Sequence, residues 1–161
     1  MHEQNQLSSR GRPGDSLDMS ESEIPRITGY DHVGIRVSDA DRALGFYQLL
    51  GFMPDPDFSN ERVAELVTRD GTRVNLIFNG ERRLAARNIL LDEPVKWPGF
   101  THGAFIVESL PALLQWAERH GIGITEGPHD WGRRLTCFVR DPDGNVLEFN
   151  ELVASPGRRA P

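Results

Sequence analysis

The chain has 161 residues, 38% of them hydrophobic, which is enough for one domain with a sizeable core. The sequence has no long apolar run that could span a membrane. Its formal net charge of -6 argues against nucleic acid as the main partner, because phosphate binding requires a basic face. The single cysteine, Cys137, excludes an intramolecular disulfide and favours a reducing, cytoplasmic compartment.

Polar tails are predicted at both ends of the chain. Residues 1–25 include Gly11 and Pro13 and have no apolar core that could form a signal peptide, so we expect a disordered tail. Residues 154–161 have a similar composition and form a second, shorter tail. A single domain is therefore expected over residues 26–153.

The first half of this domain is predicted to form a strand, a helix and further strands. His32–Val37 alternates in the manner of a strand. Ser38–Asp41 then supplies a helix-capping residue and early acidic residues, and Gly51 closes the helix. Strand-like segments follow at residues 62–68 and 73–79, joined by a turn at Asp70-Gly71.

The connection over residues 80–101 is longer than usual, and such loops are often functional or mobile. We interpret it as a linker between two modules. The alternative is that Trp97 and Phe100 line the mouth of a cleft.

The second half repeats the pattern of the first. His102–Val107 alternates again, Ser109 and Pro111 open a second helix, and Gly121 ends it. Two strand-like segments follow, Leu135–Arg140 and Val146–Glu151. Cys137 lies within the first of these, where a buried structural thiol is expected.

Just before these strands, the segment from His129 to Arg134 is a polar loop that contains Trp131. Such a loop can close over a substrate, with His129 as a general acid or base and Arg134 on a carboxylate or phosphonate. The alternative is a solvated hairpin.

A shift of 70 residues superposes the two halves, His32 falling on His102 and Gly51 on Gly121. The same comparison pairs Asn75 with Glu148, each four residues after the Gly of an Asp-Gly turn. The modules cover roughly residues 27–80 and 100–152, and each is too small to bury its own sheet. They must therefore pack together or pair with another chain.

Strand parity predicts which side chains share a face. Apolar residues such as Val33 and Leu147 point toward the helices, which leaves the opposite face to several polar side chains. These are His32, Arg36, Arg73, Asn75, His102, Glu148 and Asn150. Two imidazoles and one carboxylate form a ligand set for a divalent transition metal with positions left open. We predict that His32, His102 and Glu148 hold such an ion; the alternative is two hydrogen-bonded histidines and an exposed glutamate.

The sequence resembles the vicinal oxygen chelate superfamily, which includes glyoxalase I, extradiol dioxygenases, fosfomycin-resistance enzymes and bleomycin-binding proteins. The resemblance rests on Asp31–Val37 with Phe46-Tyr47 and Leu50-Gly51-Phe52, on His102, and on Asp141–Glu148. It implies an α+β fold of paired βαβββ modules, curled as a mixed sheet around a metal cleft. The same resemblance implies His32, His102 and Glu148 as metal ligands. The site is often shared across a dimer in small members.

Several positions depart from the patterns of individual subfamilies. Asn75 stands where glyoxalase I has a fourth, glutamate ligand, and a neutral amide is a weak ligand and a poor base. Phe138 stands where the dioxygenases have a tyrosine, and Thr136-Cys137-Phe138 lacks the serine and tyrosine of the fosfomycin transferases. Arg134 remains as an anion partner like that of the fosfomycin hydrolases. Bleomycin-binding members lack the ligand set.

The resulting expectation is a cytoplasmic, homodimeric enzyme that binds a small substrate through adjacent oxygens on a divalent ion. Three protein ligands favour Fe(II) and a dioxygenase. A lyase or isomerase of glyoxalase or epoxide-opening type, on Mn(II), Ni(II) or Zn(II), is the alternative, and a non-catalytic drug or metabolite binder is the second. We expect His129 and Arg134 to be catalytic, and the predicted substrate contacts are Arg36, Arg73, Asn75, Trp131, Phe138 and Asn150.

Overall fold

The computed structural model describes residues 27–83 and 86–153. Both predicted tails, residues 1–25 and 154–161, lie outside this range. The chain divides into two units between Tyr30 and Asp31. Only the second unit, which contains both predicted modules, is described below.

The first module is a βαβββ unit with a short 3-10 helix, and its sheet has the order β1-β4-β3-β2. β1 pairs in parallel with β4, which continues antiparallel to β3, and β3 pairs antiparallel with β2. The elements are β1 (Val33–Arg36), α1 (Ala40–Leu49), β2 (Met53–Pro54), η1 (Pro56–Phe58), β3 (Val63–Val67) and β4 (Arg73–Ile77).

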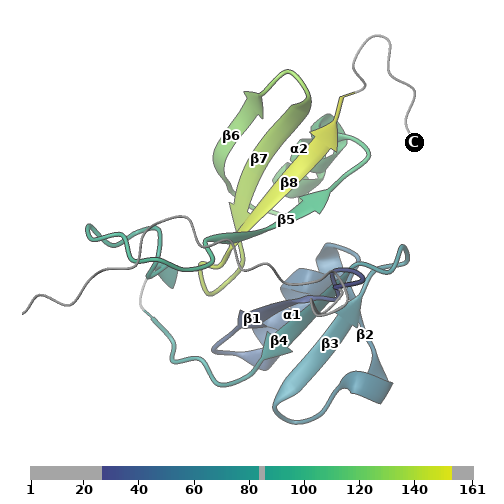
Figure 1. Ribbon diagram of the computed structural model, residues 1–161, viewed down its shortest axis with the longest axis vertical. Helices are drawn as coiled ribbons and strands as arrows, with labels where there is room; N and C mark the ends of the chain where they lie inside the picture. Colours follow the sequence, from purple (N-terminus) through teal and green to yellow (C-terminus); the bar gives the residue numbers. More distant parts are fainter. Residues whose placement is uncertain (1–26, 84–85, 154–161) are drawn as a thin grey trace, which may run out of the picture. The chain divides into compact units, whose positions relative to one another are not determined.

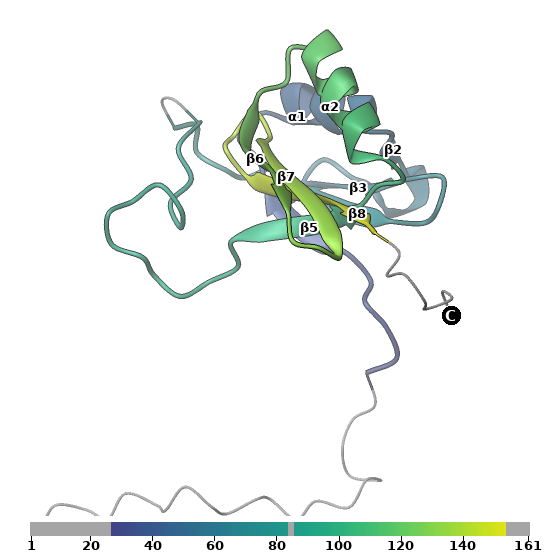
Figure 2. The same cartoon turned by 90° about the horizontal axis from the view of Figure 1, so that it is seen from above.

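The second module repeats this topology, with the sheet order β5-β8-β7-β6. Its elements are β5 (His102–Ile106), α2 (Leu110–Arg119), β6 (Ile124–Asp130), β7 (Arg134–Arg140) and β8 (Val146–Leu152). The two mixed, open sheets and their two helices confirm the predicted paired βαβββ fold (Figures 1 and 2). Neither α1 nor α2, nor any other described helix, is long and apolar enough to cross a membrane.

Helix boundaries follow the capping residues. Asp39 caps α1, accepting a hydrogen bond from the Arg42 amide, and Ser109 caps α2 through the Ala112 amide. After each helix the chain turns through a positive φ, which a glycine adopts without steric cost, at Gly51 and Gly121.

The hydrophobic core is a single cluster with contributions from both modules. An aromatic chain crosses it: Tyr47 lies 6.0 Å from Phe52, Phe52 lies 5.7 Å from Phe105, and Phe105 lies 5.8 Å from Phe149, between ring centroids. Such contacts add to the stabilisation from burial. The two halves therefore pack together within one chain, which is the first of the two predicted alternatives.

Buried polar contacts join the same halves at the turn that precedes β8. The Asp141 carboxylate, 3% exposed, accepts hydrogen bonds from the Tyr47 hydroxyl, the Asp143 and Asn145 amides and the Asn145 side chain. Burial raises the pKa of Asp141, and burial together with Asp141 raises the pKa of Tyr47. Asp143 in turn accepts from Ser38 and Arg42.

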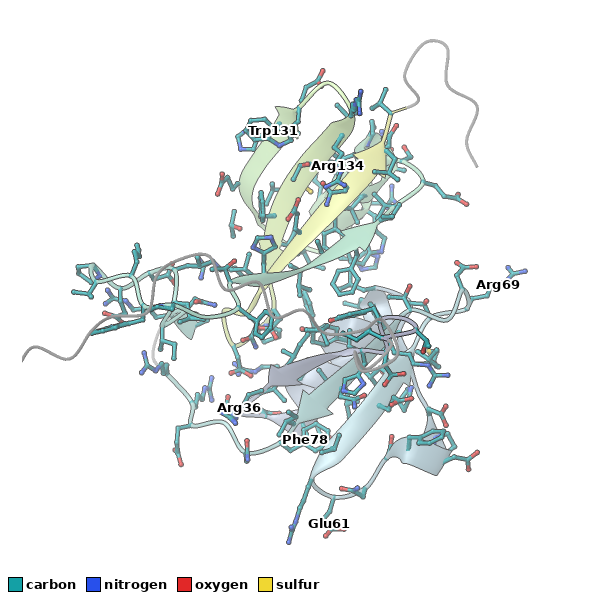
Figure 3. All side chains as sticks on the ribbon, in the orientation of Figure 1. Arg36, Glu61, Arg69, Phe78, Trp131 and Arg134 are labelled. Atoms are coloured by element: carbon teal, nitrogen blue, oxygen red, sulfur yellow. The ribbon has the colours of Figure 1, made fainter. Side chains whose placement is uncertain are left out.

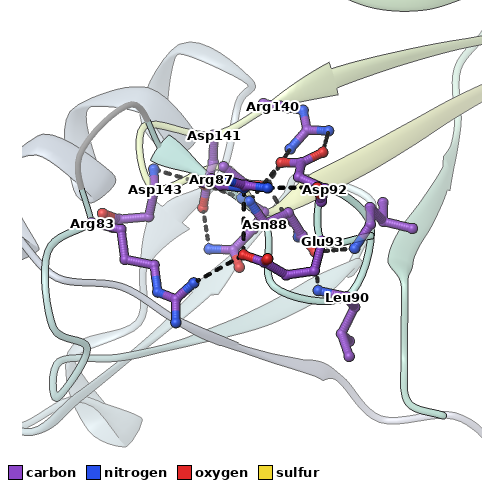
Figure 4. A network of polar contacts seen from close by, with 12 residues as sticks. Arg83, Arg87, Asn88, Leu90, Asp92, Glu93, Arg140, Asp141 and Asp143 are labelled. Atoms are coloured by element: carbon purple, nitrogen blue, oxygen red, sulfur yellow. Dashed lines mark hydrogen bonds and ion pairs between the residues drawn. The ribbon is translucent and has the colours of Figure 1, made fainter. Parts of the chain in front are cut away.

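The connection between the modules is held against this turn (Figure 4). Arg140 makes a two-pronged ion pair with Asp92, both N to O distances being 2.7 Å, and the Asn88 side chain donates to the Gly144 carbonyl. Gly144 has a φ of 86°, and a Cβ there would lie 1.8 Å from the Ala86 carbonyl oxygen. The segment is thus fastened at its middle to the second module.

We expect the Asp92–Arg140 pair to make stability depend on acidic pH. The hydrogen bond from Arg140 holds the pKa of Asp92 below its usual value. A lowered folded-state pKa contributes stability that is present above the unfolded pKa and is lost as the pH falls through the folded one. Asp92→Asn should therefore lower the urea midpoint at pH 7, and the difference from the parent should shrink below about pH 4. Asp70→Asn, in an exposed turn, is the matched control; a difference for Asp92→Asn that is equal at both pH values would contradict the pairing.

Candidate metal centre

The second module brings two of the predicted ligands together. His102 Nε2 lies 2.7 Å from Glu148 Oε2, and both side chains are partly exposed. The parallel register of β5 and β8 explains this contact, because it pairs Ala104 with Glu148 and so places His102 and Glu148 on one face of neighbouring strands. The outer ring nitrogen, His102 Nδ1, lies 2.9 Å from Thr101 Oγ1.

A buried polar chain holds the Glu148 carboxylate. The Asn150 side chain donates to Glu148 Oε1 over 2.9 Å, and the Thr136 hydroxyl donates to Asn150 Oδ1 over 2.6 Å. Asn150 is 5% exposed and Thr136 is 1% exposed. Asn150, which the sequence suggested as a substrate contact, thus orients Glu148 in the structure.

Apolar residues complete this face. Phe138 lies opposite Glu148 in the β7–β8 register, and its ring meets the His102 ring edge to face at 5.7 Å. Cys137 points the other way into the core, as predicted for a structural thiol, and burial raises its pKa. The phenylalanine therefore provides an apolar wall beside the histidine and no hydrogen-bond donor.

The first module holds the third predicted ligand beside Asn75. His32 Nδ1 lies 2.6 Å from Asp31 Oδ2. The Asn75 side chain meets complementary partners when its amide nitrogen donates to Glu65 Oε2 over 3.2 Å and its oxygen accepts from His32 Nε2 over 3.1 Å. Glu65, which is 8% exposed, is also ion-paired with Arg73.

The strand registers confirm the equivalence predicted from the repeat. Asn75 pairs with Gly34 and Glu148 pairs with Ala104, and Gly34 and Ala104 occupy the same position of the two modules. The next strand extends the comparison, since Glu65 lies opposite Asn75 as Phe138 lies opposite Glu148. Glu65 was missed in the sequence, although the tight turn at Asp70-Gly71 fixes its register.

The other candidates lie away from these pairs. His129 and Asp130 belong to β6 and not to a loop, so the predicted polar loop is a short β6–β7 hairpin. His129 contacts Glu126 at 3.3 Å, and its ring lies tilted beside the Trp131 ring, 5.4 Å away between centroids. Arg134 starts β7, four residues before Phe138 and so roughly 13 Å along the strand. Figure 3 shows Trp131 and Arg134 on this hairpin.

Arg36, which is also labelled in Figure 3, lies at the end of β1 and is exposed. Its Nε donates to the Asn79 side chain over 2.9 Å. Arg73 lies on β4 and is engaged by Glu65. Of the predicted substrate contacts, Asn75, Phe138 and Asn150 lie beside predicted metal ligands.

The three predicted ligands are thus divided between the modules: His102 contacts Glu148 in the second module, and His32 lies beside Asn75 in the first. Across residues 27–83 and 86–153, no group of three or more His, Cys, Asp or Glu side chains is placed to hold a metal ion. The chemistry of the donors nevertheless fits a divalent ion: imidazole nitrogens, a carboxylate oxygen and an amide oxygen, the histidines each having a polar partner on the outer ring nitrogen.

Comparison with known proteins places this fold and these motifs in one family. Residues 29–149 match the family model of the Glyoxalase/Bleomycin resistance protein/Dioxygenase superfamily. The chain belongs to this superfamily.

Similar proteins carry several names. The virulence protein STM3117 of Salmonella typhimurium is 28% identical over 136 residues, covering 79% of this chain and 86% of its own. The lactoylglutathione lyase of Haemophilus influenzae is 28% identical over 131 residues, covering 74% and 90%. A solved glyoxalase/dioxygenase from Nostoc punctiforme has a TM-score of 0.65 at 20% identity, covering 92% and 100%, and shares the fold.

Proposed function

We propose that this protein is a metal-dependent enzyme that binds a small substrate through two adjacent oxygens. The main support is the contact between His102 Nε2 and Glu148 Oε2, the two atoms that would hold the ion, with the Glu148 carboxylate fixed by Asn150. His32 is the third ligand in the proposal. A cytoplasmic location, suggested by the lone buried thiol, belongs to the same proposal.

The ion would be held between two copies of the chain. One copy supplies His32 and Asn75, and the other supplies His102 and Glu148. His32 directly precedes β1, and His102 is the first residue of β5. Both strands are edge strands, so each has one side that is not paired within its own sheet. A homodimer would then contain two identical sites, each made from two different modules.

When bound, the ion would supply Lewis acidity toward a substrate oxygen. The chain's own residues set the surroundings. Thr136 and Asn150 hold the Glu148 carboxylate in one orientation, and Phe138 places an apolar ring beside His102 that limits access of water.

Two reactions remain candidates. Three ligands of the His, His, Glu type favour Fe(II) and a dioxygenase, which is our first choice. A lyase or isomerase reaction on Mn(II), Ni(II) or Zn(II) is the second, and the 28% identity with a protein named lactoylglutathione lyase favours it. Oxygen uptake with Fe(II) and a panel of diols and catechols tests the first; turnover of a hemithioacetal or epoxide without oxygen would replace it with the second.

Mixing of two inactive variants tests the shared site. His32→Ala and His102→Ala should each lower the affinity for Mn(II) by at least about tenfold. After the two are unfolded and refolded together, each mixed dimer should regain one intact site, because one chain keeps His32 and its partner keeps His102. Mn(II) binding near half an equivalent per chain in the mixed dimers is expected. Recovery would be absent if each site were built within one chain.

A further inference from the structure

The first module has a buried carboxylate that the repeat alone does not explain. Where the second module has Phe138 opposite Glu148, the first has Glu65 opposite Asn75. In the first module the carboxylate lies on β3 and the neutral side chain on β4. In the second module the arrangement is reversed, with the neutral side chain on β7 and the carboxylate on β8. Glu65 lies on β3 with one tenth of its side chain exposed, and burying a carboxylate is unfavourable unless partners compensate.

Two partners surround the Glu65 carboxylate. Oε1 faces the Arg73 guanidinium, and Oε2 lies 3.2 Å from the Asn75 amide nitrogen. Only the nitrogen of an amide can donate to a carboxylate, so Glu65 selects one of the two orientations of Asn75. In that orientation the Asn75 oxygen faces His32 Nε2 at 3.1 Å.

We propose that Glu65 is a positioning residue that turns the carbonyl oxygen of Asn75 toward the nitrogen by which His32 would hold the ion. Without Glu65, the amide nitrogen keeps only the Val74 carbonyl oxygen, at 3.2 Å, as an acceptor, so the preference against presenting the NH2 group to a cation is weaker. With Glu65 in place, the first module presents the His32 ring nitrogen and the neutral Asn75 oxygen to the ion. The negative charge of Glu65 lies on the neighbouring strand, β3. This inference rests on the proposed metal site and adds a residue to it.

The first measurement needs no metal. In the metal-free protein, the side-chain amide signals of Asn75 in a 1H–15N NMR spectrum report its hydrogen bonds, and their loss in Asn75→Ala assigns them. Glu65→Met has similar length and no acceptor oxygen, and should shift both signals toward those of a solvated amide. Glu61→Met, an exposed change in the same module, is the matched control and should leave them in place.

Arg73→Met distinguishes the contact of Glu65 with Asn75 from the ion pair of Glu65 with Arg73. This variant breaks the same ion pair but keeps the contact between Glu65 and Asn75, so the Asn75 signals should move less than in Glu65→Met. Equal shifts in the two variants, or unshifted signals in Glu65→Met, would overturn the proposal. If Glu65→Met fails to fold, Glu65→Met combined with Arg73→Met removes both charges of the ion pair together with the acceptor, and unshifted Asn75 signals there would overturn the proposal equally.

Mn(II) binding supplies the second readout. Glu65→Met should weaken Mn(II) binding by about tenfold, and Glu61→Met should not change it. If Glu65→Met bound Mn(II) with the affinity of the parent, Glu65 would have no role in metal binding. If the parent protein itself bound no Mn(II), the proposed function would fail, whereas the NMR signals would still decide whether Glu65 orients Asn75.

Discussion

Glu148→Gln is expected to lower the affinity for Mn(II) or Fe(II) by about 100-fold while the fold is kept. Glutamine has nearly the same shape, so it can still accept from Asn150, but it is neutral and binds a hard divalent cation weakly. Isothermal titration of the metal-free protein measures the effect, and the circular dichroism spectrum checks the fold.

Glu118→Gln is the matched control for this experiment. Glu118 is exposed on α2, so the variant has the same change in charge and should bind metal as the parent does. Equal affinity of Glu148→Gln and the parent would remove Glu148 from the site. Loss in both variants would point to net charge as the cause.

Asp141→Ala is expected to lower the free energy of unfolding by about 3–4 kcal/mol, because four donors lose their acceptor, a cost partly offset by removal of the unfavourably buried carboxylate. Burial raises the pKa of Asp141, so ionisation of this carboxylate itself opposes folding at neutral pH. We expect the four hydrogen bonds to outweigh that effect, since unsatisfied buried donors cost about 1–3 kcal/mol each. Urea unfolding at pH 7 measures the difference, with the exposed Asp57→Ala as control.

Tyr47→Phe isolates the contact that joins the two modules. Alone, it should cost about 1 kcal/mol, because it removes one hydrogen bond to Asp141 and leaves the ring packed. In the Asp141→Ala background it should cost much less, since the partner is already gone. Additive effects of the two changes would show that the contact contributes nothing of its own.

Much of the fold follows from local patterns. Alternation in His32–Val37 and His102–Val107 placed the histidines on the face away from the helices, and the Asp-Gly turns fixed the match between Asn75 and Glu148. These features depend on a strand period and a turn, both of which act over a few residues. The contact between His102 and Glu148 followed from them.

Features set by packing were not predictable in the same way. Phe46 is buried in the core, where its ring meets the Tyr47 ring edge to face, and this burial depends on tertiary packing. Pairing with β7 extends β6 through His129, although Gly127 and Pro128 weaken its strand pattern. The buried position of Glu65 depends on its cross-strand partners, and neither its neighbours in sequence nor its charge suggests burial.

The contacts that attach the inter-module connection to the second module affect how the chain folds. Asn88 and Asp92 attach the middle of a long connection to Gly144 and Arg140, and the aromatic chain from Tyr47 to Phe149 passes from one module to the other. A repeat of this kind has two similar halves, but neither half keeps its apolar residues covered on its own. Unfolding should therefore be cooperative. A separated half should be a partly folded, aggregation-prone fragment and not an independently folding domain.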